Sequence, residues 1–187
     1  KKIFKRFEAK DIVYLAIISS IMLVTSSVMP IVAHVPIFGI IQIVLGFQFS
    51  LFPAMGISKI RKPGSLIFMA LFSGVVLVFM NPIMFFCLLL CAFIAELISL
   101  LIFRGYHKNA SCFLASWLYL PLTLPFLYLW YQIIGADNSV ASYANGNPIL
   151  AIIMSYCVIV LCALGSFLGM KISLELEHKS RKKHDSK

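Results

Sequence analysis

One acidic side chain, Glu96, lies well inside a long apolar stretch of this 187-residue chain. A charge within a membrane-spanning helix costs at least about 2.5 kcal/mol, so Glu96 is expected to face protein or water and to have a partner. In one interpretation it provides a counter-charge for a cationic or hydrogen-bonding ligand. In the other it ties two helices together, because Arg104, eight residues further on, places it near the end of its helix.

Aromatic and polar side chains gather between residues 117 and 147. A wall of aromatic rings with a few convergent polar groups is the usual composition of a small-molecule site, so we predict a pocket for a flat organic ligand here. The same rings would also suit the aromatic belt at a membrane–water interface. The candidate ligand-binding residues of this region are Trp117, Tyr128, Trp130, Tyr131, Asp137, Asn138, Tyr143 and Asn145.

Three further polar residues complete the candidate ligand-binding set. Gln42 lies in an apolar run, where its amide would bond either a ligand or a neighbouring helix. His34 lies at the end of the first apolar run, where it would touch either the ligand or solvent. Asn81 lies in a tight turn beside Pro82. His34 and Asn81 are expected on the same side of the membrane as the region of residues 135–148.

The sequence lacks the paired groups that catalysis needs. It contains no Walker A, HExxH or GxSxG motif, and its five cysteines form no CxxC pair. We therefore expect no enzyme, no cofactor and no metal site. The cysteines are interpreted as small apolar packing residues.

The composition indicates which kind of structure holds these residues in place. The chain is 61% hydrophobic and only 12% charged. Soluble domains are about 25% charged. This excludes a soluble enzyme, a disulfide scaffold, a disordered chain and a nucleic-acid module. We predict a single all-α membrane domain, with Asn81-Pro82 dividing one run that is too long for one span. The six expected spans are 12–33, 36–58, 65–80, 83–103, 112–134 and 149–170.

The basic residues predict the orientation of these spans. All 16 Lys and Arg residues lie in four segments, at 1–10, 59–62, 104–108 and 171–187, and none lies in the three opposite connections. The positive-inside rule then places both ends of the chain in the cytoplasm, with 171–187 as a basic tail. This distribution explains the net charge of +9 through the membrane and its lipids rather than through nucleic acid.

Prolines and small residues predict local geometry. Pro121 and Pro125 are expected to bend the fifth span and to open space beside it. Gly165 and Gly169 form a GxxxG pair that allows close approach of a second helix. That helix could belong to this chain or to a partner.

The architecture resembles the substrate-binding S component of an energy-coupling factor (ECF) transporter. The chain enters its first span through the segment AKDIV at 9–13, followed by Ala16 and Ser20. This is similar to the start of helix one in that family, where small residues four apart dock on the coupling subunit. The motif RKPG at 61–64 with Asn81-Pro82 resembles the thiamin-precursor branch. The ending from Gly165 to Lys171 with its basic tail resembles the MptD-type branch.

The resemblance implies a function and a set of partners. It implies high-affinity capture of a vitamin or micronutrient, such as a thiamin- or hydroxymethylpyrimidine-like heterocycle, at a prokaryotic plasma membrane. It also implies transport driven by a coupling subunit and two ATPase subunits, with Ala16 and Ser20 as the docking residues. Two alternatives remain: a self-sufficient carrier or channel coupled through Glu96, and an intramembrane enzyme.

Overall fold

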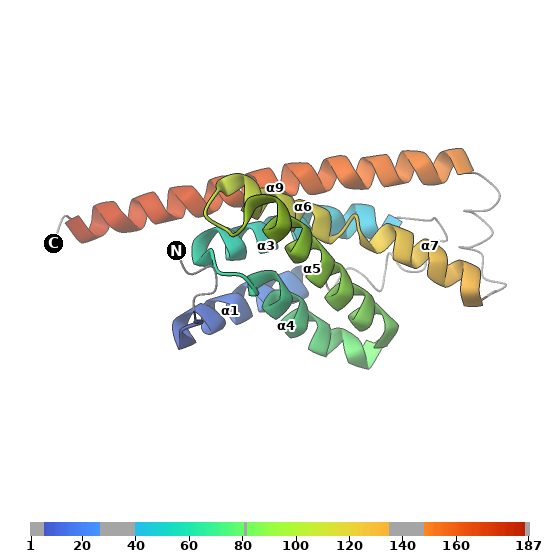
Figure 1. Ribbon diagram of the computed structural model, residues 1–187, viewed down its shortest axis with the longest axis horizontal. Helices are drawn as coiled ribbons and strands as arrows, with labels where there is room; N and C mark the ends of the chain where they lie inside the picture. The colour runs from blue at the N-terminus through green and yellow to red at the C-terminus, as the bar shows by residue number, and fades with distance from the viewer. Residues whose placement is uncertain (1–5, 27–39, 81, 135–147, 186–187) are drawn as a thin grey trace.

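The computed structural model describes residues 6–26, 40–80, 82–134 and 148–185, and this part of the chain is helical without any strand (Figure 1). This agrees with the predicted all-α class. The helices are α1 (Ala9–Thr25), α3 (Ile40–Ile60), α4 (Ser65–Met80), α5 (Pro82–Phe103), α6 (Asn109–Tyr119), α7 (Thr123–Ile134) and α9 (Pro148–Asp185).

Three of these helices contain a stretch long and apolar enough to cross a membrane. Large apolar side chains such as Phe86, Leu101 and Ile152 are more than half exposed on the outside of the bundle. An exposed apolar surface of this extent indicates a membrane protein. The three stretches are Gln42–Ile60, Phe85–Phe103 and Ile152–Lys179.

Proline positions explain two of the helix boundaries. α4 ends at Met80 and α5 begins at Pro82, as expected because proline is tolerated only at the start of a helix. The expected bend in the fifth apolar run is a complete break, since α6 ends at Tyr119 and α7 begins at Thr123. Pro121 lies in this break.

The last helix is longer than the sequence pattern indicates. We expected the helix to end near residue 170, where the apolar run stops, but α9 continues to Asp185. The segment 171–185 is rich in Leu, Glu, Lys and Arg, which favour helix, and it contains neither Gly nor Pro. Hydrophobicity set the expected end, whereas helix propensity sets the observed one.

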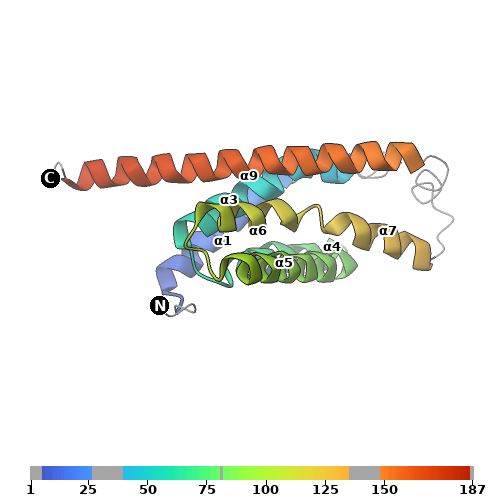
Figure 2. The same ribbon diagram turned by 45° about the horizontal axis from the view of Figure 1, so that its top comes forward.

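The GxxxG pair is used within this chain. α9 packs along α3, and a Cβ on Gly165 or Gly169 would overlap the backbone carbonyl oxygens of Phe47 and Leu51 respectively. The two helices therefore approach with backbone against backbone. In Figure 2, α9 lies on one side of α3 and α6, and α4 and α5 lie on the other.

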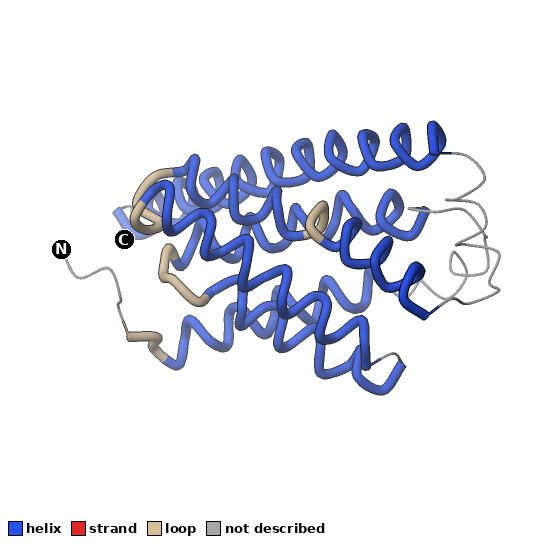
Figure 3. Tube along the Cα trace, turned by 45° about the vertical axis from the view of Figure 1, so that its right-hand side comes forward, coloured by secondary structure: helices blue, strands red, loops and turns tan. Residues whose placement is uncertain are grey.

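Buried side chains from every described helix, α1 to α9, contribute to the main core, and Tyr119 on α6 is completely buried within it. The two short connections, residues 61–64 and 104–108, lie at the same end of the bundle (Figure 3). Each connection begins with an arginine in the left-handed region. Arg61 follows α3 with a φ of 51°, and Arg104 follows α5 with a φ of 55°. A left-handed residue of this kind is a common way to terminate a helix.

Candidate functional site

An apolar groove of about 560 Å³ lies between α7 and α9. The break between α6 and α7 borders this groove, and both Pro121 and Pro125 line it. This agrees with the space expected beside the fifth apolar run. The remaining lining residues are Leu124, Tyr128, Ile152, Ser155, Tyr156 and Ile159.

Two tyrosines give the groove its aromatic and polar character. Tyr128 on α7 is 44% exposed and Tyr156 on α9 is 68% exposed. A phenol ring can pack against a flat ligand while its hydroxyl hydrogen-bonds a polar edge. Tyr128 was a sequence candidate, whereas Tyr156 and Ser155 were missed, although they are adjacent polar residues in an otherwise apolar run.

Trp117 on α6 lies behind the groove. Its Nε1–H donates a hydrogen bond to the carbonyl oxygen of Ile159 at 3.0 Å, and its ring stacks on Phe113 with centroids 5.9 Å apart. Since Ile159 is part of the groove wall, this bond positions α9 relative to α6. In the structure, Trp117 supports the groove from behind and is not one of its lining residues.

Glu96 ties two helices together. Its side chain is only 2% exposed, and its carboxylate accepts hydrogen bonds from the backbone N–H groups of Gly64 and Ile67, the latter at 3.4 Å. These donors belong to the start of α4, where N–H groups have no partner within the helix and the helix dipole favours an anion. Glu96 does not line the α7–α9 groove.

Tyr106 lies against this carboxylate from the connection between α5 and α6. Its side chain is buried, and burial followed by the negative charge of Glu96 raises the pKa of Tyr106 well above its usual range. Among the described residues, its hydroxyl faces Glu96 without reaching good hydrogen-bond geometry with any acceptor. Because its pKa is raised, the phenol of Tyr106 stays neutral beside the Glu96 carboxylate.

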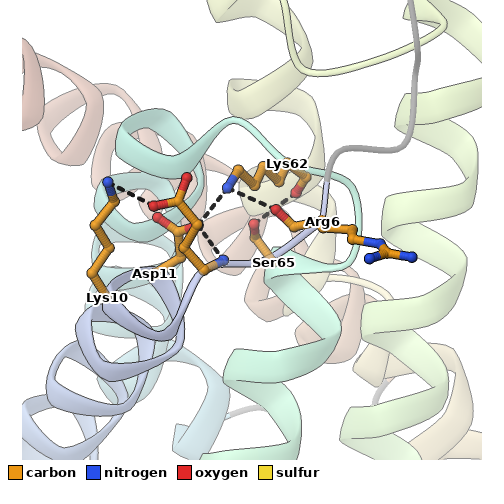
Figure 4. Close-up of polar contacts among 6 residues, drawn as sticks. Arg6, Lys10, Asp11, Lys62 and Ser65 are labelled. Carbon is orange, nitrogen blue, oxygen red and sulfur yellow. Dashed lines mark hydrogen bonds and ion pairs between the residues drawn. The ribbon is translucent and has the colours of Figure 1, made fainter.

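Charged contacts join the segments at this end of the bundle. The Nζ atom of Lys62 lies 2.5 Å from Oδ2 of Asp11 and donates to the carbonyl oxygen of Arg6 at 3.0 Å (Figure 4). Asp11 Oδ2 also accepts the backbone N–H of Glu8 at 3.0 Å. The bond from Lys62, and then the one from Glu8, hold the pKa of Asp11 below its usual range.

Several candidate residues lie outside the described part of the chain or have undescribed side chains. Gln42 is described, and it is buried on α3. Trp130 and Tyr131 belong to α7, but their side chains are not described. The remaining candidates outside the described residues are His34, Asn81, Asp137, Asn138, Tyr143 and Asn145.

The small residues of α1 lie on a partly uncovered side of that helix. Ala16 is half-buried and Ser20 is exposed, with the Ser20 hydroxyl donating to the carbonyl oxygen of Ala16 at 2.8 Å. Ile17 and Ile21 beside them are also exposed. Because Ser20 satisfies its hydroxyl within its own helix, this surface offers small, largely apolar contacts.

Comparisons with protein-family models, curated proteins and solved structures found no match to this chain. Within the described residues, no group of three or more His, Cys, Asp or Glu side chains is arranged to hold a metal ion.

Proposed function

We propose that this chain is the substrate-binding membrane subunit of an ECF-type importer for a small heteroaromatic vitamin or vitamin precursor. The groove between α7 and α9 carries this proposal. Its volume of about 560 Å³ lies within the range of about 300–1,000 Å³ that is usual for small-molecule sites. Its lining of apolar side chains with the rings of Tyr128 and Tyr156 suits a flat ligand with a polar edge.

The position of Glu96 supports a subunit that depends on partners for energy. A self-sufficient proton-coupled carrier would need an intramembrane acid that is free to change partners. Glu96 instead bonds the backbone of α4 and lies behind Tyr106. We therefore assign the energy source to a separate coupling subunit and two ATPase subunits, with the α1 surface around Ala16 and Ser20 as the docking face.

The proposed orientation has six spans with both chain ends in the cytoplasm of a prokaryotic cell. The groove then opens on the outer side, where the undescribed segment 135–147 connects α7 to α9. Labelling of single cysteines placed at Lys59 or Lys108 should occur only from the cytoplasmic side. Labelling of either position from outside would contradict the orientation.

Mass spectrometry of the small molecule that co-purifies with the protein is the direct test of function. We expect a heterocycle of vitamin size, bound tightly by the isolated chain, and no uptake when this chain alone is placed in liposomes. Thiamin and hydroxymethylpyrimidine are the first ligands to titrate. Uptake by the isolated chain would contradict the proposal.

A further inference from the structure

We propose that the phosphate of an anionic lipid headgroup binds in a second pocket, between the end of α3 and the C-terminal part of α9. This pocket has a volume of about 480 Å³ and is predominantly polar. It is separate from the α7–α9 groove and shares no residue with it. The residues that line it are Lys59, Arg61, Leu174, Glu177 and His178.

The position of the pocket matches the depth of a lipid headgroup. The apolar stretch of α3 ends at Ile60. The apolar run of α9 stops near residue 170, and Leu174, Glu177 and His178 follow it within about 12 Å of helix. The pocket therefore lies just beyond these two ends, where hydrocarbon gives way to headgroups. Leu174 borders it on the side that leads back along α9 toward the apolar part of the helix, as a headgroup site requires.

Arg61 provides a fixed positive charge. Its Nε donates to the carbonyl oxygen of Ser58 at 3.0 Å, and its two terminal nitrogens donate to the His107 carbonyl oxygen at 3.4 Å and to Asn109 Oδ1 at 2.8 Å. All three acceptors are neutral, so these bonds hold the guanidinium in place without neutralising it. A preorganised guanidinium is a strong phosphate partner.

Lys59 and His178 provide two further donors. Lys59 lines the pocket, and its Nζ atom lies 5.1 Å from the centre of the Tyr14 ring on α1 in a cation–π contact. The pocket also contains the carboxylate of Glu177. The two cations, Lys59 and Arg61, outnumber this one carboxylate, so the lining carries a net positive charge that attracts an anion.

Lipid binding to the purified full chain in detergent tests the proposal. Native mass spectrometry would compare retention of phosphatidylglycerol with that of phosphatidylcholine, which carries a phosphate but no net charge. We expect one tightly retained phosphatidylglycerol. Lys59→Gln should weaken the affinity for this lipid about fivefold, which is the effect expected from losing one contact between a lysine and an anionic lipid. Lys59→Gln combined with His178→Gln should weaken the affinity further.

A matched pair of substitutions controls for overall charge. Lys108→Gln with Arg104→Gln removes two cationic side chains from exposed positions outside the pocket, and it should leave retention unchanged. Equal losses in both double variants would overturn the proposal. Displacement of the lipid by millimolar inorganic phosphate would keep the phosphate site but overturn its assignment to a lipid. Retention of acidic peptide in place of phosphatidylglycerol would overturn it in favour of a protein partner.

Discussion

The carboxylate of Glu96 on α5 accepts the backbone N–H of Gly64 at the start of α4. This bond, with the second one from Ile67, satisfies donors that a helix leaves unpaired at its N-terminus. The only acid well inside the apolar stretches is thus committed to joining two helices in the described structure.

Removing this carboxylate should destabilise the protein. Glu96→Ala would leave buried N–H groups unpaired, and we expect a loss of about 1–3 kcal/mol in the free energy of unfolding. Glu96→Gln keeps one acceptor oxygen, so its free energy of unfolding should fall by less than that of Glu96→Ala. Thermal unfolding in detergent would measure both. A Glu96→Ala variant as stable as the wild type would show that the tie is not needed.

Close packing of α9 on α3 should make Gly169 intolerant of any side chain. In Gly169→Ala the new Cβ would overlap the Leu51 carbonyl oxygen, so the helices would have to separate. We expect a loss of about 1–3 kcal/mol, as for other overpacked sites. Leu168→Ala, at an exposed neighbouring position, is the control and should change the unfolding temperature little.

The two groove tyrosines should contribute to ligand affinity without contributing to folding. Because Tyr128 and Tyr156 are exposed, Tyr128→Ala and Tyr156→Ala should leave thermal stability unchanged and weaken binding by about tenfold each. Isothermal titration with the co-purified ligand would measure this. Phe93→Ala, an exposed aromatic on α5 outside the groove, should bind normally. Normal binding by both tyrosine variants would place the ligand elsewhere.

The Asp11–Lys62 ion pair should make stability depend on acid pH. The pKa of Asp11 is lower in the folded than in the unfolded protein, so the stabilisation is complete above the unfolded value of about 3.9. It should disappear as the pH falls through the folded pKa. Unfolding temperatures of wild type and Asp11→Asn should therefore differ at pH 6, and the difference should shrink steadily as the pH is lowered below about 3.9. A constant difference across this range would contradict the pair's role.

The α1 surface should be required for transport but not for ligand binding. Ala16→Trp would place a large ring on the proposed docking face, so we expect uptake by the complete transporter to be abolished while the isolated chain binds ligand normally. Phe86→Trp, on an exposed part of α5, is the control. Full uptake with Ala16→Trp would show that the coupling subunit contacts another surface.

Local sequence signals predicted much of the fold. Pro82 was expected to divide one long apolar run and does begin a helix, because proline lacks a backbone donor. Pro121 was expected to bend its helix, and the structure has a complete break there. The end of α9 was not predictable from hydropathy, since residues 171–185 remain helical without being apolar. The GxxxG pattern predicted a close contact but could not identify α3 as the partner, because that depends on how distant segments pack.

The candidate site was predictable only in part. Tyr128 was identified through the aromatic cluster around it, but Tyr156 was missed because an isolated tyrosine in an apolar run carries no pattern of its own. Glu96 was recognised as needing a partner, and both interpretations were open. Which one applies in the described structure depends on the N-terminus of α4, which is 32 residues away in sequence.

One uninterrupted helix, α9, forms a wall of both pockets, through Tyr156 in the groove and His178 in the phosphate pocket. These two positions are about 33 Å apart along a straight helix. The backbone contact of Gly165 and Gly169 with α3 lies between them. The two pockets therefore share one continuous helical wall, on either side of a contact that leaves no room for a side chain.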